Sequence, residues 1–159
     1  MERIASFTVD HNVLVPGLYL SRRDGSVVTF DLRFKRPNTG DLLTNAQMHS
    51  VEHLIATLLR NSPEKDAVIY FGPMGCQTGF YFLFDGTQLT CARAIDLLRR
   101  CFEAASVYPG PMPGQSAAEC GNYRNLDLAL GKECCAWYAE LIRDWAEDRL
   151  TYPQTERNG

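Results

Sequence analysis

The chain has 159 residues, of which 45% are hydrophobic and 22% charged, and a formal net charge of −3; these values predict one globular domain over residues 1–159. The acidic balance argues against a nucleic-acid-binding protein, whose surface carries a basic excess, and no apolar run approaches the roughly 20 residues that cross a bilayer. Because the N-terminus lacks the apolar stretch of a secretory signal, we expect a cytoplasmic protein.

Strands and helices alternate along the chain. The clearest strand is SVVTFDLRF (26–34), where one apolar face alternates with a more polar one, as in a half-buried strand. Further strands are predicted over 6–10, 67–71 and 79–86, helices over 42–60, 88–105 and 132–150, loops over 37–41 and 109–115, and a loose tail over 151–159. The pattern predicts an α+β fold, with an antiparallel sheet covered by helices on one face.

The stretch MHSVEHL (48–54) holds two of the three histidines in the chain. On a helix, His49 and His53 stand one turn apart on the same face, with Glu52 on its flank. The apolar residues of this helix cluster on roughly the opposite side, which leaves both imidazoles free to face a separate space. An exposed pair of histidines is the alternative, but the HxxEH order favours a metal site.

A catalytic metal site built on two histidines needs a third protein ligand and an open fourth position. Cys120 in AAECGNY is the candidate, because Gly121 lets the backbone turn sharply after it. Cys76 in PMGCQTG is the other unusual thiol, since Gly75 and Gly79 allow close approach of the backbone to a ligand. No CxxC motif occurs, so we expect free thiols rather than disulfides. The other cysteines are expected to be small buried residues of helices: Cys91, Cys101, Cys134 and Cys135.

Five stretches of the chain occur in the order and spacing of one known family. They are SFTVDHN (6–12), FDLRFKRPN (30–38), HSVEH (49–53), PMGCQTGFY (73–81) and ECGNY (119–123). On these stretches the sequence resembles the S-ribosylhomocysteine lyases, the LuxS family. The resemblance implies an α/β sandwich that works as a homodimer, with active sites at the subunit interface. It also implies cleavage of S-ribosylhomocysteine to homocysteine and 4,5-dihydroxy-2,3-pentanedione, the autoinducer-2 precursor, by two aldose–ketose isomerisations and a β-elimination.

The resemblance also implies the roles of the site residues. His49, His53 and Cys120 match the ligands of one divalent metal per subunit, Fe(II) with Zn or Co as substitutes. Glu52 and Cys76 match the two acid–base residues of the family. We assign Cys76 chiefly to proton transfers at carbon, and Glu52 to oxygen protons and the elimination step.

Three further residues match positions that contact the substrate in the family: Ser6, His11 and Arg33. Arg33 lies on the polar face of the predicted strand 26–34, where a guanidinium can fork onto a carboxylate. The chain departs from the family pattern at Tyr70, where an acidic residue is common, and at Leu126, where a histidine is common. These departures raise the alternative of a changed substrate preference.

Two other functions fit parts of the pattern. HxxEH is also the order of the inverzincin metallopeptidases, which need a carboxylate as third ligand; Glu119, Glu133 and Glu140 are the candidates, but PMGCQTG and ECGNY have no role in such an enzyme. The other alternative is a catalytically silent relative or a structural metal module, for which a closed set of four ligands is expected.

Overall fold

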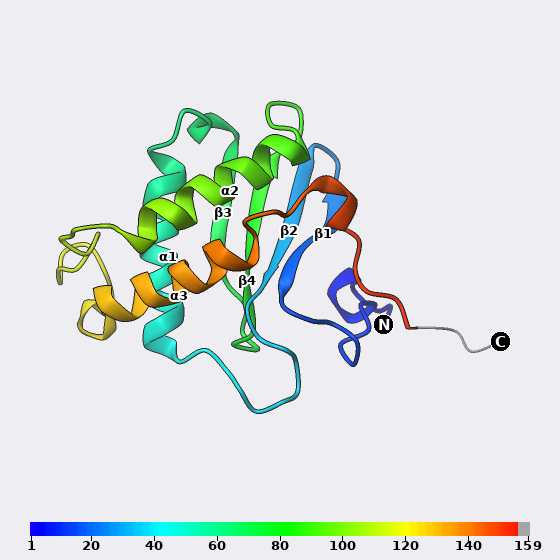
Figure 1. Ribbon diagram of the computed structural model, residues 1–159, viewed down its shortest axis with the longest axis horizontal. Helices are drawn as coiled ribbons and strands as arrows, with labels where there is room; N and C mark the ends of the chain where they lie inside the picture. The colour runs from blue at the N-terminus through cyan, green and yellow to red at the C-terminus, as the bar shows by residue number, and fades with distance from the viewer. Residues whose placement is uncertain (156–159) are drawn as a thin grey trace.

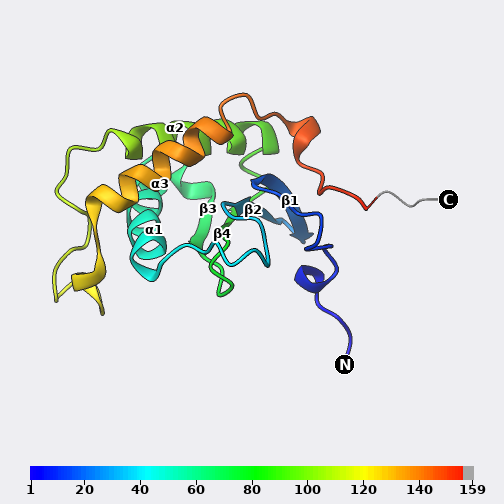
Figure 2. The same cartoon turned by 60° about the horizontal axis from the view of Figure 1, so that its bottom comes forward.

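Four strands form one antiparallel sheet, and three α-helices cover one of its faces (Figures 1 and 2). The computed structural model describes residues 1–155. The strand order is β1-β2-β4-β3, and each neighbouring pair is antiparallel. The elements are β1 (Gly17–Asp24), β2 (Val27–Arg33), α1 (Asn45–Arg60), β3 (Val68–Pro73), β4 (Gly79–Asp85), α2 (Cys91–Ser106) and α3 (Leu128–Leu141), with short 3-10 turns at Ala5–Phe7, Lys65–Ala67, Tyr123–Asn125 and Glu147–Arg149. The predicted α+β fold, with helices on one face of an antiparallel sheet, is confirmed.

Successive side chains of β2 and β4 point to opposite faces of the sheet, so every second residue lies under the helices. Phe30 pairs with Phe82 and Leu32 with Phe80, and all four side chains are completely buried. Just beyond β2, Phe34 stacks on Tyr138 of α3, with 4.2 Å between the ring centroids. This face is therefore the core of the molecule, because aromatic rings of the sheet interlock with those of the helices.

The other side of the sheet, which we call the second face, carries the alternate residues of the same strands. They are Thr29, Asp31, Arg33, Tyr81 and Leu83. The sequence predicted a half-buried strand over 26–34, but the polar face of this strand is buried as well: Asp31 is only 1% exposed and Arg33 only 3%. Segments from both ends of the chain lie on this side and remove these polar groups from water.

Polar caps fix where the helices begin. The Thr44 hydroxyl accepts from the Gln47 amide (3.1 Å), and the Gln47 side chain accepts from the Thr44 amide (2.8 Å). This reciprocal cap ends the preceding loop and starts α1 three residues later than the sequence pattern predicted. Thr90 caps α2 by accepting from the Arg93 amide. The two predicted helices 42–60 and 88–105 are confirmed, and each begins three residues later than predicted.

The first predicted strand, over 6–10, was wrong. Residues Ala5–Phe7 form a 3-10 turn, and the Asp10 carboxylate accepts from the Asn12 amide (3.0 Å), which turns the chain away from an extended path. The first strand is instead β1, at the edge of the sheet. Its second half is exposed, with Arg22 and Arg23 side chains in solvent, so its apolar alternation is too short to identify the strand from the pattern.

The third helix begins earlier and ends earlier than the predicted 132–150. Asp127 caps α3 by accepting from the Leu130 amide (3.0 Å). After α3 the chain turns, which brings Trp145 edge-on against Tyr19 of β1, with ring centroids 6.0 Å apart. Four apolar side chains at helical spacing within the predicted range are nevertheless all buried: Cys135, Tyr138, Ile142 and Trp145.

The prediction of a loose tail was wrong for its first part, residues 151–155. The Leu20 amide of β1 donates to the Leu150 carbonyl (2.8 Å), and the Tyr152 ring stacks on Tyr19. Residues 156–159 of that predicted tail lie outside the described residues. Among the helices of the described residues, none is both long and apolar enough to span a bilayer.

Candidate metal centre and active site

Three side chains from distant parts of the sequence converge beside α1. His49 and His53 lie one turn apart on α1, and Cys120 comes from the loop before α3. One donor atom from each lies within 4.8 Å of the others, and Cys120 Sγ is 3.3 Å from His49 Nε2. Ligands that share one tetrahedral ion stand about 3.5 Å apart. The geometry therefore brings together the three residues that the sequence singled out.

A second contact on each imidazole fixes which ring nitrogen faces the cluster. His53 Nδ1 donates to the Pro113 carbonyl (2.8 Å), because a carbonyl oxygen can only accept. His49 Nδ1 is hydrogen-bonded to the Asn125 side-chain oxygen. Both Nε2 atoms are thereby left for a ligand, an arrangement typical of metal-binding histidines. Asn125 and Pro113 were not identified from the sequence, since neither belongs to a recognisable motif.

The cluster requires a glycine at position 114. Its φ is +67°, in the left-handed region, and a Cβ at this position would lie 2.9 Å from His53 Nδ1. Any other residue would both strain the backbone and push the imidazole away. The Pro/Gly loop 109–115, predicted as a surface loop, thus holds one side of the cluster. Its other anchor is Gln115, whose side chain donates to the Leu126 carbonyl (2.9 Å).

The donor set fits a divalent transition metal. Two imidazoles and one thiolate supply three ligands, and none of the carboxylates in the described residues joins them. This leaves a fourth position, as in catalytic rather than structural sites. Two of the carboxylates considered for a peptidase are engaged elsewhere: Glu119 accepts from Ser116 (2.6 Å), and Glu140 pairs with Arg143.

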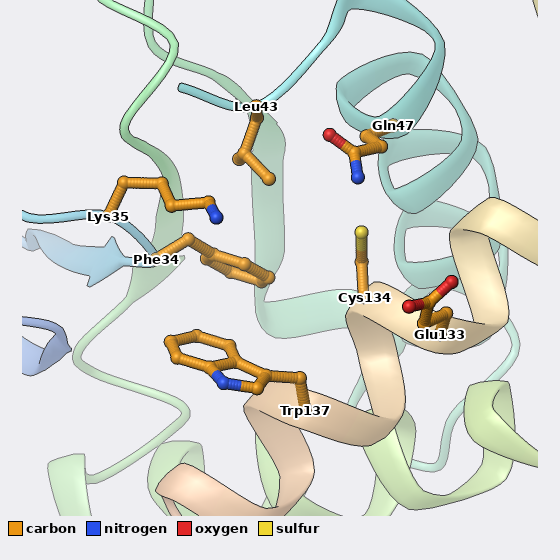
Figure 3. Close-up of a pocket in the computed structure, with 7 residues that line it drawn as sticks. All are labelled: Phe34, Lys35, Leu43, Gln47, Glu133, Cys134 and Trp137. Carbon is orange, nitrogen blue, oxygen red and sulfur yellow. The ribbon is translucent and has the colours of Figure 1, made fainter. Parts of the chain in front are cut away.

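Glu133, the third such carboxylate, lines a different pocket, between the start of α1 and α3 (Figure 3). Cys134 points into the same pocket and is half-buried, whereas the other three helical cysteines are buried as predicted: Cys91, Cys101 and Cys135. Burial raises the pKa of the Cys101 thiol to about 12, and it also raises the pKa of Cys134. These thiols stay protonated at neutral pH and are distinct from the two candidate site cysteines.

Cys76 lies in the connection between β3 and β4 and is exposed. Its Sγ is 3.0 Å from the Thr78 hydroxyl and 3.9 Å from Arg33 Nη1. Gly79 is needed here, since a Cβ would lie 2.3 Å from the Leu32 carbonyl oxygen on the neighbouring strand, but a Cβ at Gly75 would meet open space. The thiol therefore stands beside a cation at the edge of the second face.

The candidate substrate contacts lie with Cys76 rather than with the histidines. Ser6 lines a pocket on the second face together with Tyr70 and Tyr81. His11 lies in the same N-terminal segment, and its Nδ1 is 2.9 Å from the Val9 carbonyl. The structure thus separates the candidate residues of one chain into two groups, one on α1 and one on the second face of the sheet.

The remaining candidate residues are divided between the α1 region and the second face of the sheet. Glu52 is half-buried on α1 beside His53, and its carboxylate makes no hydrogen bond with the described residues. Tyr70, where the family pattern commonly has an acid, is half-exposed in the pocket of Ser6. Leu126 is buried in the core, and only its carbonyl reaches the loop beside the cluster.

An α+β sandwich with a two-histidine, one-cysteine centre on a helix is a scaffold for metal-assisted chemistry on a small molecule. A family model described as S-Ribosylhomocysteinase (LuxS) matches residues 4–149, and the chain belongs to this family. A protein of Finegoldia magna is 44% identical and aligns over 97% of this chain and 100% of its own length. A protein of Desulfotalea psychrophila is 45% identical over 96% of this chain and 99% of its own. Both are named S-ribosylhomocysteine lyase, so the resemblance drawn from the five stretches is confirmed.

Proposed function

We propose that the protein is a metal-dependent S-ribosylhomocysteine lyase. It releases homocysteine and 4,5-dihydroxy-2,3-pentanedione by two aldose–ketose isomerisations and a β-elimination. The observation that carries this proposal is the convergence of His49, His53 and Cys120 within 4.8 Å, in a chain of the LuxS family. The whole chain, residues 1–159, is proposed to be one lyase domain.

His49, His53 and Cys120 would hold one divalent metal per chain, for which we propose Fe(II), with Zn or Co as substitutes. When bound, such an ion acts as a Lewis acid that stabilises negative charge on the sugar oxygens. The contacts that Asn125 and Pro113 make with the two imidazoles support this role, because they orient both Nε2 atoms before an ion binds.

Cys76 and Glu52 are proposed to move the protons. In each isomerisation, Cys76 takes a proton from the carbon next to the carbonyl and returns it to the neighbouring carbon, which shifts the carbonyl one position along the sugar. Glu52 carries the accompanying protons between oxygens. In the last step a proton is removed from the carbon next to the new carbonyl, the C–S bond breaks, and the bonding pair leaves with the homocysteine sulfur.

Arg33 is proposed to bind the carboxylate of the homocysteine moiety. Its Nη1 lies 3.9 Å from Sγ of the exposed Cys76, which places the guanidinium beside the proposed carbon base. Ser6 and His11 complete the proposed substrate contacts, and Ser6 already lines a pocket on this face.

We propose that the working unit is a homodimer. The two groups of candidate residues lie on different parts of one chain, so a second copy is needed to place Cys76 and Arg33 opposite the histidine cluster. Exposed apolar side chains near the second face support this arrangement: Phe7 is 62% exposed and Tyr70 is 50% exposed.

Thiol release tests the activity directly. The protein is purified anaerobically with Fe(II), its metal content is measured, and free homocysteine is followed with a thiol reagent after S-ribosylhomocysteine is added. We expect release by the wild type and by Cys134→Ala, and a loss of about 10³-fold or more in Cys76→Ala, which lacks the proposed carbon base. Absence of release from wild-type protein with one metal per chain would contradict the proposal and favour a silent or altered-substrate relative.

A further inference from the structure

A buried series of polar contacts connects the C-terminal segment to Cys76. The Tyr152 hydroxyl donates to Asp31 Oδ2 (2.8 Å), and the same oxygen accepts from Arg33 Nη2 (2.6 Å). On its other side, Arg33 Nη1 donates to the Thr78 hydroxyl (2.7 Å) and lies 3.9 Å from Cys76 Sγ. The guanidinium is thus held between a carboxylate and the candidate catalytic thiol.

The position of Tyr152 is fixed by contacts other than its hydroxyl. Its ring stacks on Tyr19, with 5.0 Å between centroids and 28° between planes. The backbone before it is held to β1 by the bond from the Leu20 amide to the Leu150 carbonyl. Burial, reinforced by the Asp31 charge, raises the pKa of Tyr152, so the hydroxyl stays protonated and donates. Tyr152 also lies beyond residues 4–149, the part that the family model matches.

The ion pair that Tyr152 touches is almost completely removed from water. Asp31 and Arg33 are 1% and 3% exposed, and no other described residue hydrogen-bonds to the Asp31 carboxylate. In such a low-dielectric place the charge on the carboxylate determines how completely the guanidinium is neutralised. A hydroxyl that donates a hydrogen bond to Asp31 offsets part of the negative charge of the carboxylate. More of the positive charge of Arg33 is then available to Cys76 and to a bound anion.

We propose that Tyr152 is a positioning residue for Arg33. By holding Asp31, it keeps the guanidinium between Asp31 and Cys76 and prevents it from being drawn fully onto the carboxylate. This inference rests on the proposed function for the role of Arg33 in substrate binding. The geometry of the contacts themselves does not depend on that function.

The variant Tyr152→Phe removes only the hydroxyl and keeps the stacked ring. Its matched control is Tyr19→Phe, which removes a hydroxyl from the neighbouring ring that donates to the Val15 carbonyl (2.9 Å) and not to Asp31. Two quantities are measured on the metal-loaded protein: kcat and KM for S-ribosylhomocysteine, and the rate at which iodoacetamide alkylates Cys76 at fixed pH, followed by peptide mass spectrometry.

For Tyr152→Phe we expect KM to rise about three- to tenfold, because the binding group Arg33 is displaced, and kcat to fall by no more than about threefold, because the proton carrier Cys76 stays in place but has less positive charge beside it. The alkylation of Cys76 should slow by about threefold, because less positive charge lies beside the thiol. Tyr19→Phe should change neither quantity. Equal values in the two variants and the wild type would overturn the proposal and leave Tyr152 as an anchor of the C-terminal segment only.

Two outcomes separate this proposal from the proposed function. If wild-type protein releases no homocysteine, the lyase assignment fails, but the alkylation rates still decide whether Tyr152 acts on Cys76 through Arg33. If Tyr152→Phe is less stable than the wild type, alkylation is measured at a lower temperature, at which its circular dichroism matches that of the wild type. Its Cys76 should still be alkylated about threefold more slowly there, and an equal or faster rate would overturn the proposal.

Discussion

The histidine cluster and the second face of the sheet hold their polar groups in opposite ways. His49 and His53 are half-buried on a helix surface, and each is oriented by one contact from a loop. Asp31 and Arg33 are almost fully buried in the sheet and orient each other. A metal site needs donors that an incoming ion can reach, whereas a buried ion pair is stable only while each charge keeps its partner.

This difference in burial predicts how each region tolerates change. Removal of a donor from the helix surface should affect the ligand and leave the fold intact, because water can replace the lost group. Removal of one partner from the second face leaves an uncompensated charge in the interior, so the fold itself should suffer. The following predictions test this contrast from the largest expected effect to the smallest.

Cys120→Ala should have the largest effect, and on function alone. It removes one of three donors, so we expect the metal content to fall well below one ion per chain and homocysteine release to drop by about 10³-fold or more. The fold should persist, because Cys120 is part of a surface loop. Metal content is measured by elemental mass spectrometry and folding by circular dichroism, with Cys134→Ala as the control. Retention of the metal by Cys120→Ala would point to a carboxylate ligand and to the metallopeptidase alternative.

The sequence was sufficient to identify the donors of the cluster. Their residue types and the four-residue spacing on a helix report directly on side-chain placement, since helical geometry is local. The groups that orient the donors were missed, because Asn125 and Pro113 reach the histidines through loop conformations that no short motif encodes. A glycine directly after Pro113 was the only signal, and its positive φ became visible only in the structure.

On the second face the sequence was misleading. The alternation of strand 26–34 was interpreted correctly, but a half-buried strand was expected, and the burial of the charged residues on its polar face was missed. Their burial depends on Tyr152, which lies 121 residues away from Asp31 in the chain. Such a contact follows from the path of the whole polypeptide, so neither periodicity nor composition could have predicted it.

Asp31→Ala should therefore produce the largest loss of stability. It leaves the Arg33 guanidinium buried without its carboxylate, and we expect the free energy of unfolding to fall by about 3–5 kcal/mol. Asp24→Ala is the matched control, because it breaks the ion pair between Asp24 and Arg22 on the surface. The Arg22 side chain is 46% exposed and that of Asp24 61%, so this variant should show no measurable loss of stability. Urea unfolding of the two variants and the wild type measures both effects. Similar small losses in both variants would mean that water reaches the Asp31–Arg33 pair.

Asn125→Ala should have the smallest effect, since it removes the partner of His49 Nδ1 and leaves all three metal donors in place. Without that contact the imidazole can rotate, so part of the binding free energy is lost in ordering the ring when the ion binds. We therefore expect the metal affinity to fall by about 10- to 100-fold. The control is Asn122→Ala, which keeps the backbone amide that donates to Cys120 Sγ (3.4 Å). Affinities are obtained by competition with a chromogenic chelator. Equal affinities in the two variants and the wild type would show that α1 alone orients His49, and the loop before α3 would then supply Cys120 and the Pro113 contact to His53 without orienting His49.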